Sequence, residues 1–155
     1  MPIKCTTPRD LPGRMINEET RRYQQVLLNE LAMIGELVIN FARSSDRERY
    51  TDQTGNLTSS LRYCIVVDGQ IVNMPELGFV LKGYEGREEA KRYLEEIASG
   101  EKRGMQLIFV AGMPYAAYVE RIEGKHVLDR PEEYAQQLFK AMVKKFSKAS
   151  KGKQK

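Results

Sequence analysis

The chain is poor in the residues that usually carry chemistry. Among its 155 residues there are no tryptophans, one histidine and two cysteines. A single histidine argues against a histidine-dependent triad and against a multi-histidine metal site. Cys5 and Cys64 are too few for a disulfide framework and form no Cys-x-x-Cys pair. We therefore expect a protein that is not an enzyme and holds no cofactor or metal, with Cys64 as a small buried residue and His126 at the surface.

Long apolar runs are also missing. The longest uncharged apolar stretch, residues 107–118, is too short to span a bilayer. Residues 1–6 lack the apolar core of a secretory signal. We therefore expect no membrane association, and synthesis in a reducing cytoplasm.

The body of the chain has almost no excess charge. The formal net charge is +4, but removing residues 148–155 leaves 21 basic and 21 acidic residues. A DNA-binding face normally needs Lys and Arg clustered within the folded body. We predict that residues 148–155 form a disordered tail, which is more often merely solvated than functional. Its candidate contacts to DNA or another polyanion are Lys148, Lys151, Lys153 and Lys155.

Spacing of apolar residues predicts three main helices in one domain over residues 17–147. Apolar residues that recur at steps of three or four predict a long helix over 17–43, with Asn17 as its cap. The same pattern predicts a middle helix over 87–98 and a C-terminal helix beginning at Pro131. Before the first helix, residues 1–16 contain three prolines and a glycine and predict an irregular arm.

Alternating and short apolar runs predict a small sheet. Residues 61–67 alternate, Asp68-Gly69 supplies a two-residue turn and residues 70–73 return, which predicts a β-hairpin. The run 105–111 between two glycines predicts a buried strand, and 79–81 predicts a short additional one. The expected class is α+β: a small mixed or antiparallel sheet packed by a long N-terminal helix, a middle helix and a C-terminal helix.

Two short segments carry the most specific patterns. The first is Thr54-Gly55-Asn56-Leu57-Thr58-Ser59-Ser60-Leu61, in which Asn56 can cap one helical turn before the hairpin. The second is Pro114-Tyr115-Ala116-Ala117-Tyr118-Val119-Glu120, in which Pro114 can open a short helix. We interpret the first as the entry to the hairpin and the second as the exit from a buried strand, not as one divided site.

Partner contact and internal packing are both open for these segments. Two tyrosines three positions apart share one face of a helix, so Tyr115 and Tyr118 can meet a partner or pack internally. Glu120 can pair with a neighbouring basic residue or another subunit, or face water. The candidate interface or motif residues are Thr54, Gly55, Asn56, Leu57, Ser60, Tyr115, Ala116, Tyr118, Val119 and Glu120.

Together the two segments resemble the signature of the tailed-phage head-tail joining and tail-completion family. The first is similar to that family's Thr-Gly-Asn-Leu-Arg-x-Ser-Ile element, with Thr58 in place of the arginine. The second is similar to its Tyr-Ala-x-Tyr-Val-Glu element, with the following glycine delayed to Gly124. The order of predicted elements over 17–146 also agrees, with residues 75–103 as an insertion and the family's C-terminal Pro-Phe element missing.

The resemblance implies a structural protein of a phage or prophage, placed at the head-tail junction or the tail end. Such subunits form rings, and portal-adaptor and tail-tube proteins are the implied partners. The implied location is the host bacterial cytoplasm during assembly, then the neck or tail of the virion. A ring needs heterologous interfaces that close, for which the long first helix and the Tyr115/Tyr118 face are candidates. The alternative is a nucleic-acid-binding accessory protein that uses the basic tail.

Overall fold

The computed structural model describes residues 11–44, 50–100, 103–122 and 124–152. Within them a three-stranded antiparallel sheet has the order β2-β1-β3, and five helices surround it. This arrangement confirms the expected α+β class. In chain order the elements are α1 (Leu11–Arg43), α2 (Asn56–Ser59), β1 (Leu61–Val67), β2 (Gln70–Asn73), α3 (Tyr84–Gly100), β3 (Met105–Ala111), α4 (Ala116–Arg121) and α5 (Asp129–Gly152).

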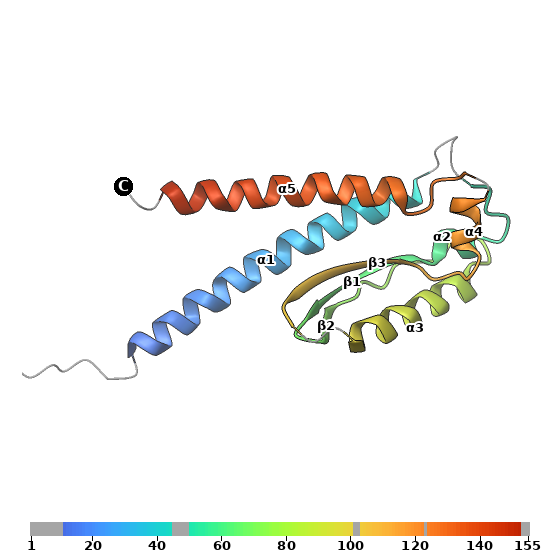
Figure 1. The fold of residues 1–155 in the computed structure, drawn as a ribbon. Helices are drawn as coiled ribbons and strands as arrows, with labels where there is room; N and C mark the ends of the chain where they lie inside the picture. The colour runs from blue at the N-terminus through green and yellow to red at the C-terminus, as the bar shows by residue number, and fades with distance from the viewer. Residues whose placement is uncertain (1–10, 45–49, 101–102, 123, 153–155) are drawn as a thin grey trace, which may run out of the picture.

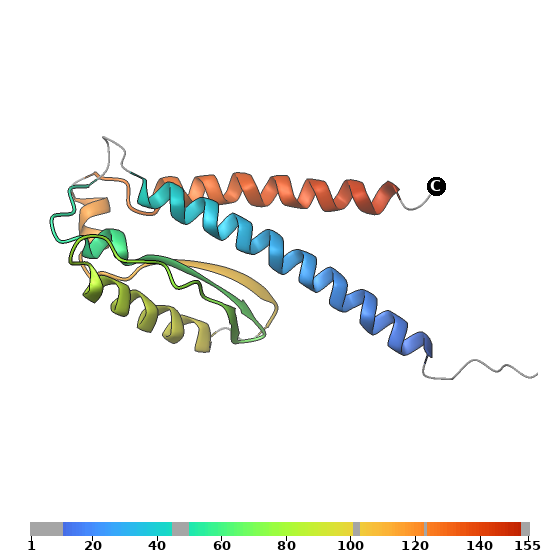
Figure 2. The same ribbon diagram turned by 180° about the vertical axis from the view of Figure 1, so that it is seen from behind.

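The sheet lies between two layers of helix. Helix α1 crosses one face with α5 packed on it, α3 covers the other face, and α2 and α4 lie at one end (Figure 1; Figure 2 shows the reverse side). Side chains of β1 alternate between the layers: Tyr63 and Ile65 join the core beneath α1, and Cys64 and Val66 join the core against α3. All four are at most 1% exposed, so the central strand is apolar on both faces.

The predicted hairpin and the strand over 105–111 are confirmed, but apart from Val110 that strand is only partly buried. Asp68 and Gly69 have φ angles of 48° and 82°, as a two-residue hairpin turn requires. Strand β3 pairs with β1 along its whole length, but β2 pairs only from Ile65 onward. Beside the first half of β1, the chain after β2 is held by Arg62, whose guanidinium donates to the carbonyls of Pro75 and Leu77 at 2.7 and 3.2 Å.

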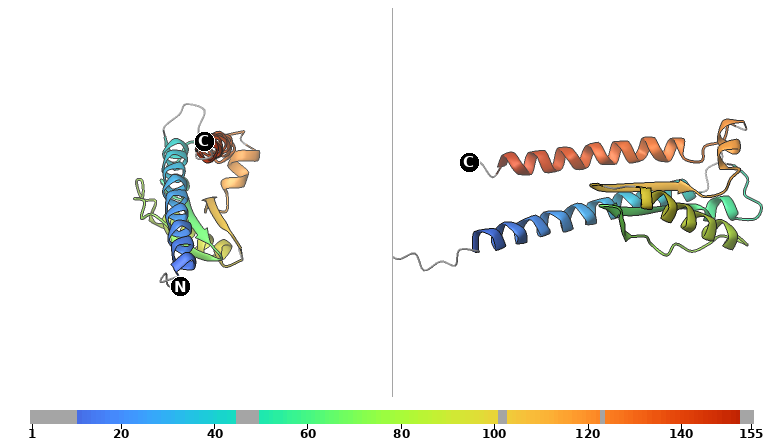
Figure 3. Two further views of the ribbon diagram at one scale, coloured as in Figure 1. Left: turned by 90° about the vertical axis from the view of Figure 1, so that its left-hand side faces the viewer. Right: turned by 60° about the horizontal axis from the view of Figure 1, so that its bottom comes forward.

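Helices α1 and α5 extend beyond the sheet. The N-terminal part of α1 and the C-terminal part of α5 project in the same direction and diverge (Figures 1 and 3). By length and composition alone, residues Arg14–Arg43 would also suit a membrane span, and 33% of the apolar window is buried. Its buried residues Ile34 and Val38 belong to the main core, so the sheet end of this helix serves the fold.

Both predicted irregular ends are helical where the structure describes them. Helix α1 begins at Leu11, so Asn17 lies inside it and does not cap it. Pro12 is tolerated because the first turn of a helix needs no N–H donor there. Helix α5 continues to Gly152, since lysine and alanine favour a helix even without a core to cover. Residues 1–10 and 153–155, with Lys153 and Lys155, lie outside the described residues.

The middle of the chain departs most from expectation. No strand forms over 79–81, because the Val80 N–H donates to the Ser59 side chain and Leu81 has a φ of 53°, incompatible with a strand. Helix α3 spans Tyr84–Gly100, so it begins three residues before and ends two residues after the predicted range of 87–98. Within residues 75–103, the segment predicted as an insertion relative to the family, α3 supplies the second core through Ala90, Leu94 and Ala98.

Candidate functional site

The two motif segments lie against each other. The Gly112 N–H, two residues before the second segment, donates to the Ser60 carbonyl at 3.1 Å. The Tyr115 hydroxyl shares a hydrogen bond with the Thr54 side chain. Burial, together with the nearby carboxylate of Asp52, raises the pKa of Tyr115. The segments therefore lie side by side at one end of the molecule, the first at the entry to β1 and the second just after β3, as the sequence indicated.

Asp52 organises the first segment and was missed by the sequence reasoning. Its two carboxylate oxygens accept the backbone N–H groups of Gly55 at 2.9 Å and Thr58 at 2.7 Å. Gly55 has a φ of 79°, the left-handed conformation that glycine adopts without strain. Thr54 Oγ1 accepts the Asn56 N–H at 3.3 Å. An aspartate shortly before a glycine is a common turn pattern, and that signal would have identified Asp52.

Asn56 joins two helices instead of capping its own. Gly55 is the N-cap residue of α2 and makes no side-chain cap bond. The Asn56 amide oxygen accepts the Gly86 N–H of α3 at 3.2 Å, and its amide nitrogen donates to Glu85 at 3.4 Å. A Cβ on Gly86 would lie 2.0 Å from the Asn56 carbonyl oxygen, so only glycine permits this approach. The Asn56 side chain thus satisfies an N-terminal donor of α3.

Four of the predicted motif residues are buried packing residues. Their side chains are at most 9% exposed, which removes them from any surface: Leu57, Ser60, Ala116 and Val119. The tyrosines differ, since Tyr115 is 40% and Tyr118 57% exposed. Among the candidate interface residues of the second segment, these two tyrosines are the exposed ones.

Glu120 has a role inside the chain. Its Oε1 accepts the N–H groups of Leu128 at 2.9 Å and Asp129 at 2.8 Å, where α5 begins. A carboxylate there satisfies unpaired donors and complements the positive end of the helix. The hydrogen bonds of Glu120 thus go to the start of α5, although we had left pairing with a basic residue, a neighbouring subunit or water open.

One side of α5 carries a basic stripe. Lys140, Lys144 and Lys148 follow one another at helical i,i+4 spacing and are exposed, on the opposite side from the buried Met142. Lys151 belongs to the same helix. Lys145 lies off this stripe and forms an ion pair with Glu30 of α1.

An exposed apolar projection follows β2. We call Phe79, Val80, Leu81 and Tyr84 the apolar tip; their exposed fractions are 48%, 42%, 67% and 56%. The rings of Phe79 and Tyr84 meet edge to face with centroids 6.2 Å apart, and the Arg87 guanidinium lies over both at 5.2 and 4.9 Å. This exposed surface was not predicted from the sequence, because residues 79–81 were expected to form a strand.

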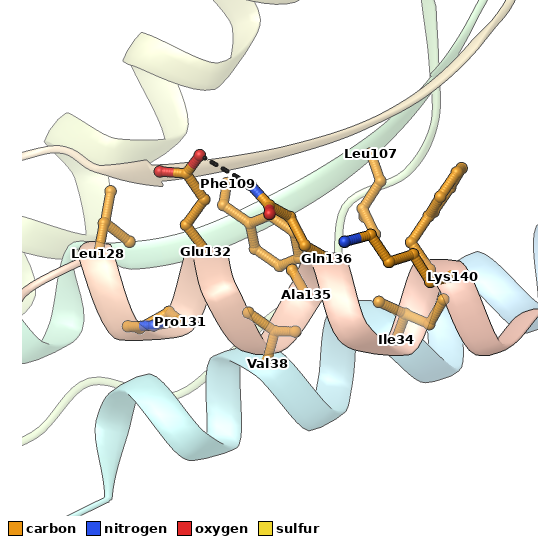
Figure 4. Close-up of a pocket in the computed structure, with 11 residues that line it drawn as sticks. Ile34, Val38, Leu107, Phe109, Leu128, Pro131, Glu132, Ala135, Gln136 and Lys140 are labelled. Carbon is orange, nitrogen blue, oxygen red and sulfur yellow. Dashed lines mark hydrogen bonds between the residues drawn. The ribbon is translucent and has the colours of Figure 1, made fainter.

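A cavity of about 550 Å³ lies between α1, α5 and β3 (Figure 4). We call it the apolar groove. Leu107 and Phe109 of β3 and Ile34 and Val38 of α1 give it apolar walls. The α5 side adds Leu128, Pro131, Ala135 and Phe139, with Glu132, Gln136 and Lys140 as its polar members.

No protein-family model, curated protein or solved structure matches this chain. The resemblance therefore rests on the two motifs and the order of elements. Within the described ranges, no group of three or more His, Cys, Asp or Glu side chains is arranged to hold a metal ion.

Proposed function

We propose that this protein is a structural subunit of a phage or prophage that forms a ring at the head-tail junction or the tail end. Its role is geometric and not catalytic, and portal-adaptor and tail-tube proteins are its partners. The observation that carries the proposal is the apolar surface left uncovered on one small chain. Contiguous apolar surface on a soluble protein usually marks an interaction site.

The projecting part of α1 contributes most to this surface. Met15, Ile16, Tyr23 and Val26 are 61%, 65%, 50% and 44% exposed. At 100° per residue they fall within one arc of the helix, and they belong to the N-terminal half of α1, the end that extends beyond the sheet (Figure 1). Contact with neighbouring subunits or partner proteins would remove this stripe from water. The motif resemblance assigns such contacts to the phage neck or tail, after assembly in the host cytoplasm.

Deletion of the gene from the phage or prophage that carries it tests this proposal. We expect filled heads and separate tails by electron microscopy, with joined particles restored when the protein is supplied in trans. The double variant Tyr23→Glu/Val26→Glu should fail to restore them. Gln24→Glu, an exposed change on the same helix, is its control. Normal infectious particles from the deletion strain would contradict the proposal.

Nucleic-acid binding through α5 is the second candidate. It is favoured by the basic stripe of Lys140, Lys144 and Lys148, and opposed by the neutral body. The test is duplex DNA binding between about 50 and about 200 mM salt, with and without residues 148–155. Loss of salt-sensitive binding on truncation would support this role, and an unchanged salt profile would exclude the tail from it.

A further inference from the structure

We infer that the apolar tip of one subunit inserts into the apolar groove of the next, so that copies associate head to tail. The inference rests on the proposed function as a ring-forming subunit, and it names the two surfaces that meet. The partner is a second copy of this chain.

The apolar tip is held in place before any partner arrives. Arg43 donates to the Gly78 carbonyl at 2.5 Å, the Val80 N–H to Ser59 Oγ at 2.8 Å, and the Lys82 N–H to the Thr54 carbonyl at 3.0 Å. Anchors come from both sides of the tip, so the projecting side chains have a fixed base. A surface that is already ordered loses little conformational freedom on binding.

Leu81 combines strain with exposure. Its φ of 53° is unfavourable for a side chain branched at Cγ, and the side chain is 67% exposed. Strained conformations persist when the surroundings enforce them, and they cluster at functional positions. Here the backbone bonds on either side of Leu81 present an apolar side chain to solvent. Such a side chain beside two aromatic rings has the composition of an interface anchor.

The apolar groove exists because one strand lacks a cover. Tyr63 and Ile65 of β1 are at most 1% exposed under α1, whereas their neighbours Phe109 and Leu107 on β3 are only partly buried. Helix α5 packs on α1, so it borders the space beside β3 but does not fill it (Figure 4). A cavity of about 550 Å³ is within the usual size of binding pockets. An apolar insertion would complete this layer.

Placement of the two surfaces favours a second copy of this chain. Viewed along α5, the loop that follows β2 and the strand β3 lie on opposite sides of the molecule (left-hand view of Figure 3). The sheet order β2-β1-β3 gives the same result, since β2 and β3 are its two edges. Different patches at opposite edges form a heterologous contact, which repeats from copy to copy and can close into a ring.

Charge specifies an orientation. Lys82 is exposed next to Leu81, and Glu132 is exposed at one end of the groove, hydrogen-bonded to Gln136 at 3.3 Å. Lys140 lies two helical turns away, which leaves the Glu132 end as the acidic one. Insertion of the tip with Lys82 toward Glu132 therefore pairs opposite charges.

Disulfide trapping between two variants tests the contact. In a Cys5→Ser background, concentrated Leu81→Cys protein is mixed with Gln136→Cys protein under mild oxidation. Cys64 is fully buried and does not compete. We expect a covalent heterodimer to form about tenfold faster than in a mixture of Val72→Cys with Gln136→Cys, because docking raises the effective concentration of the thiols. Val72 is 49% exposed and lies outside both surfaces.

Two further mixtures decide the outcome. Adding Lys82→Glu to the Leu81→Cys protein should slow trapping, and adding Glu132→Lys to its partner should restore it. A rate equal to the Val72 control, or faster trapping by Tyr23→Cys of α1, would overturn the inference. Thermal unfolding of each variant confirms that it is folded.

If the deletion strain still yields separate heads and tails while trapping fails, this contact alone is wrong. If trapping succeeds but deletion has no effect, the proposed function alone is wrong.

Discussion

Gly35 of α1 lies directly against the ring of Tyr63 in β1. A Cβ on Gly35 would be 2.3 Å from Tyr63 Cε2, well inside any real contact. The ring cannot move aside easily, because it is 1% exposed and its hydroxyl donates to Glu36 Oε1 at 2.9 Å. The glycine is what allows the long helix to approach the sheet this closely.

Gly35→Ala should therefore destabilise the fold. Alanine is the better helix former by about 1 kcal/mol, but overpacking against a fixed ring costs about 1–3 kcal/mol. We expect a net loss in the free energy of unfolding, measured in urea. Gly100→Ala at the end of α3, where a Cβ meets nothing within 4 Å, should be neutral or slightly stabilising. Equal effects of the two changes would contradict this packing.

Alkaline pH should weaken the fold through two neighbouring residues. Burial raises the pKa of the Cys64 thiol from 9.0 to about 11. Burial first, and then the hydrogen bond and charge of Glu36, raise the pKa of Tyr63. Both groups lose their protons more readily in the unfolded chain, so their contribution to stability is complete below the unfolded pKa and declines as pH rises above it.

The thiol contribution should decline between pH 9.0 and about 11, and that of Tyr63 should begin to decline at its ordinary pKa of 10.0. Cys64→Ala should remove the first component, worth about 2–3 kcal/mol by linkage. Tyr63→Phe should remove the second. Urea unfolding across this range measures both, and an identical pH profile for Cys64→Ala and the parent would contradict the buried thiol.

Glu120→Ala should destabilise α5 at its start. The change leaves the N–H groups of Leu128 and Asp129 without their acceptor, at a cost of about 1–2 kcal/mol. Glu120→Gln keeps an acceptor oxygen and should lose less. Glu96→Ala on the exposed face of α3 is the control. Unfolding in urea compares the three, and a Glu120→Ala variant as stable as the control would exclude the capping role.

Arg62→Met should release the segment after β2. Arg62 is 2% exposed, and burial is the main cause that lowers the pKa of its guanidinium. Loss of its bonds to the carbonyls of Pro75 and Leu77 should cost about 2–3 kcal/mol. Limited proteolysis near Leu77 should become faster. The control Arg92→Met, at an exposed ion pair, should change neither the free energy of unfolding nor the rate of this proteolysis. Unchanged proteolysis of Arg62→Met would contradict this anchoring.

Elements defined by local spacing were predictable. The hairpin follows from alternation in β1 and from Asp68-Gly69, and both were confirmed. The ends of α1 and α5 were not, since neither a proline in the first turn nor a lysine-rich run stops a helix. The strand predicted over 79–81 does not form, because the Val80 N–H donates to the side chain of Ser59, which is distant in sequence, and is not available to pair with another strand.

The sequence by itself determined the α+β class, the three main helices, the hairpin and the motifs on which the family resemblance rests. These depend on residue type and on spacing within a few turns or strand positions. Only the tertiary structure decided that the two motifs meet, that Asn56 and Glu120 serve other helices, and that a projecting tip and an open groove lie at opposite edges. Such properties depend on which side chains far apart in the chain come into contact and which are left uncovered.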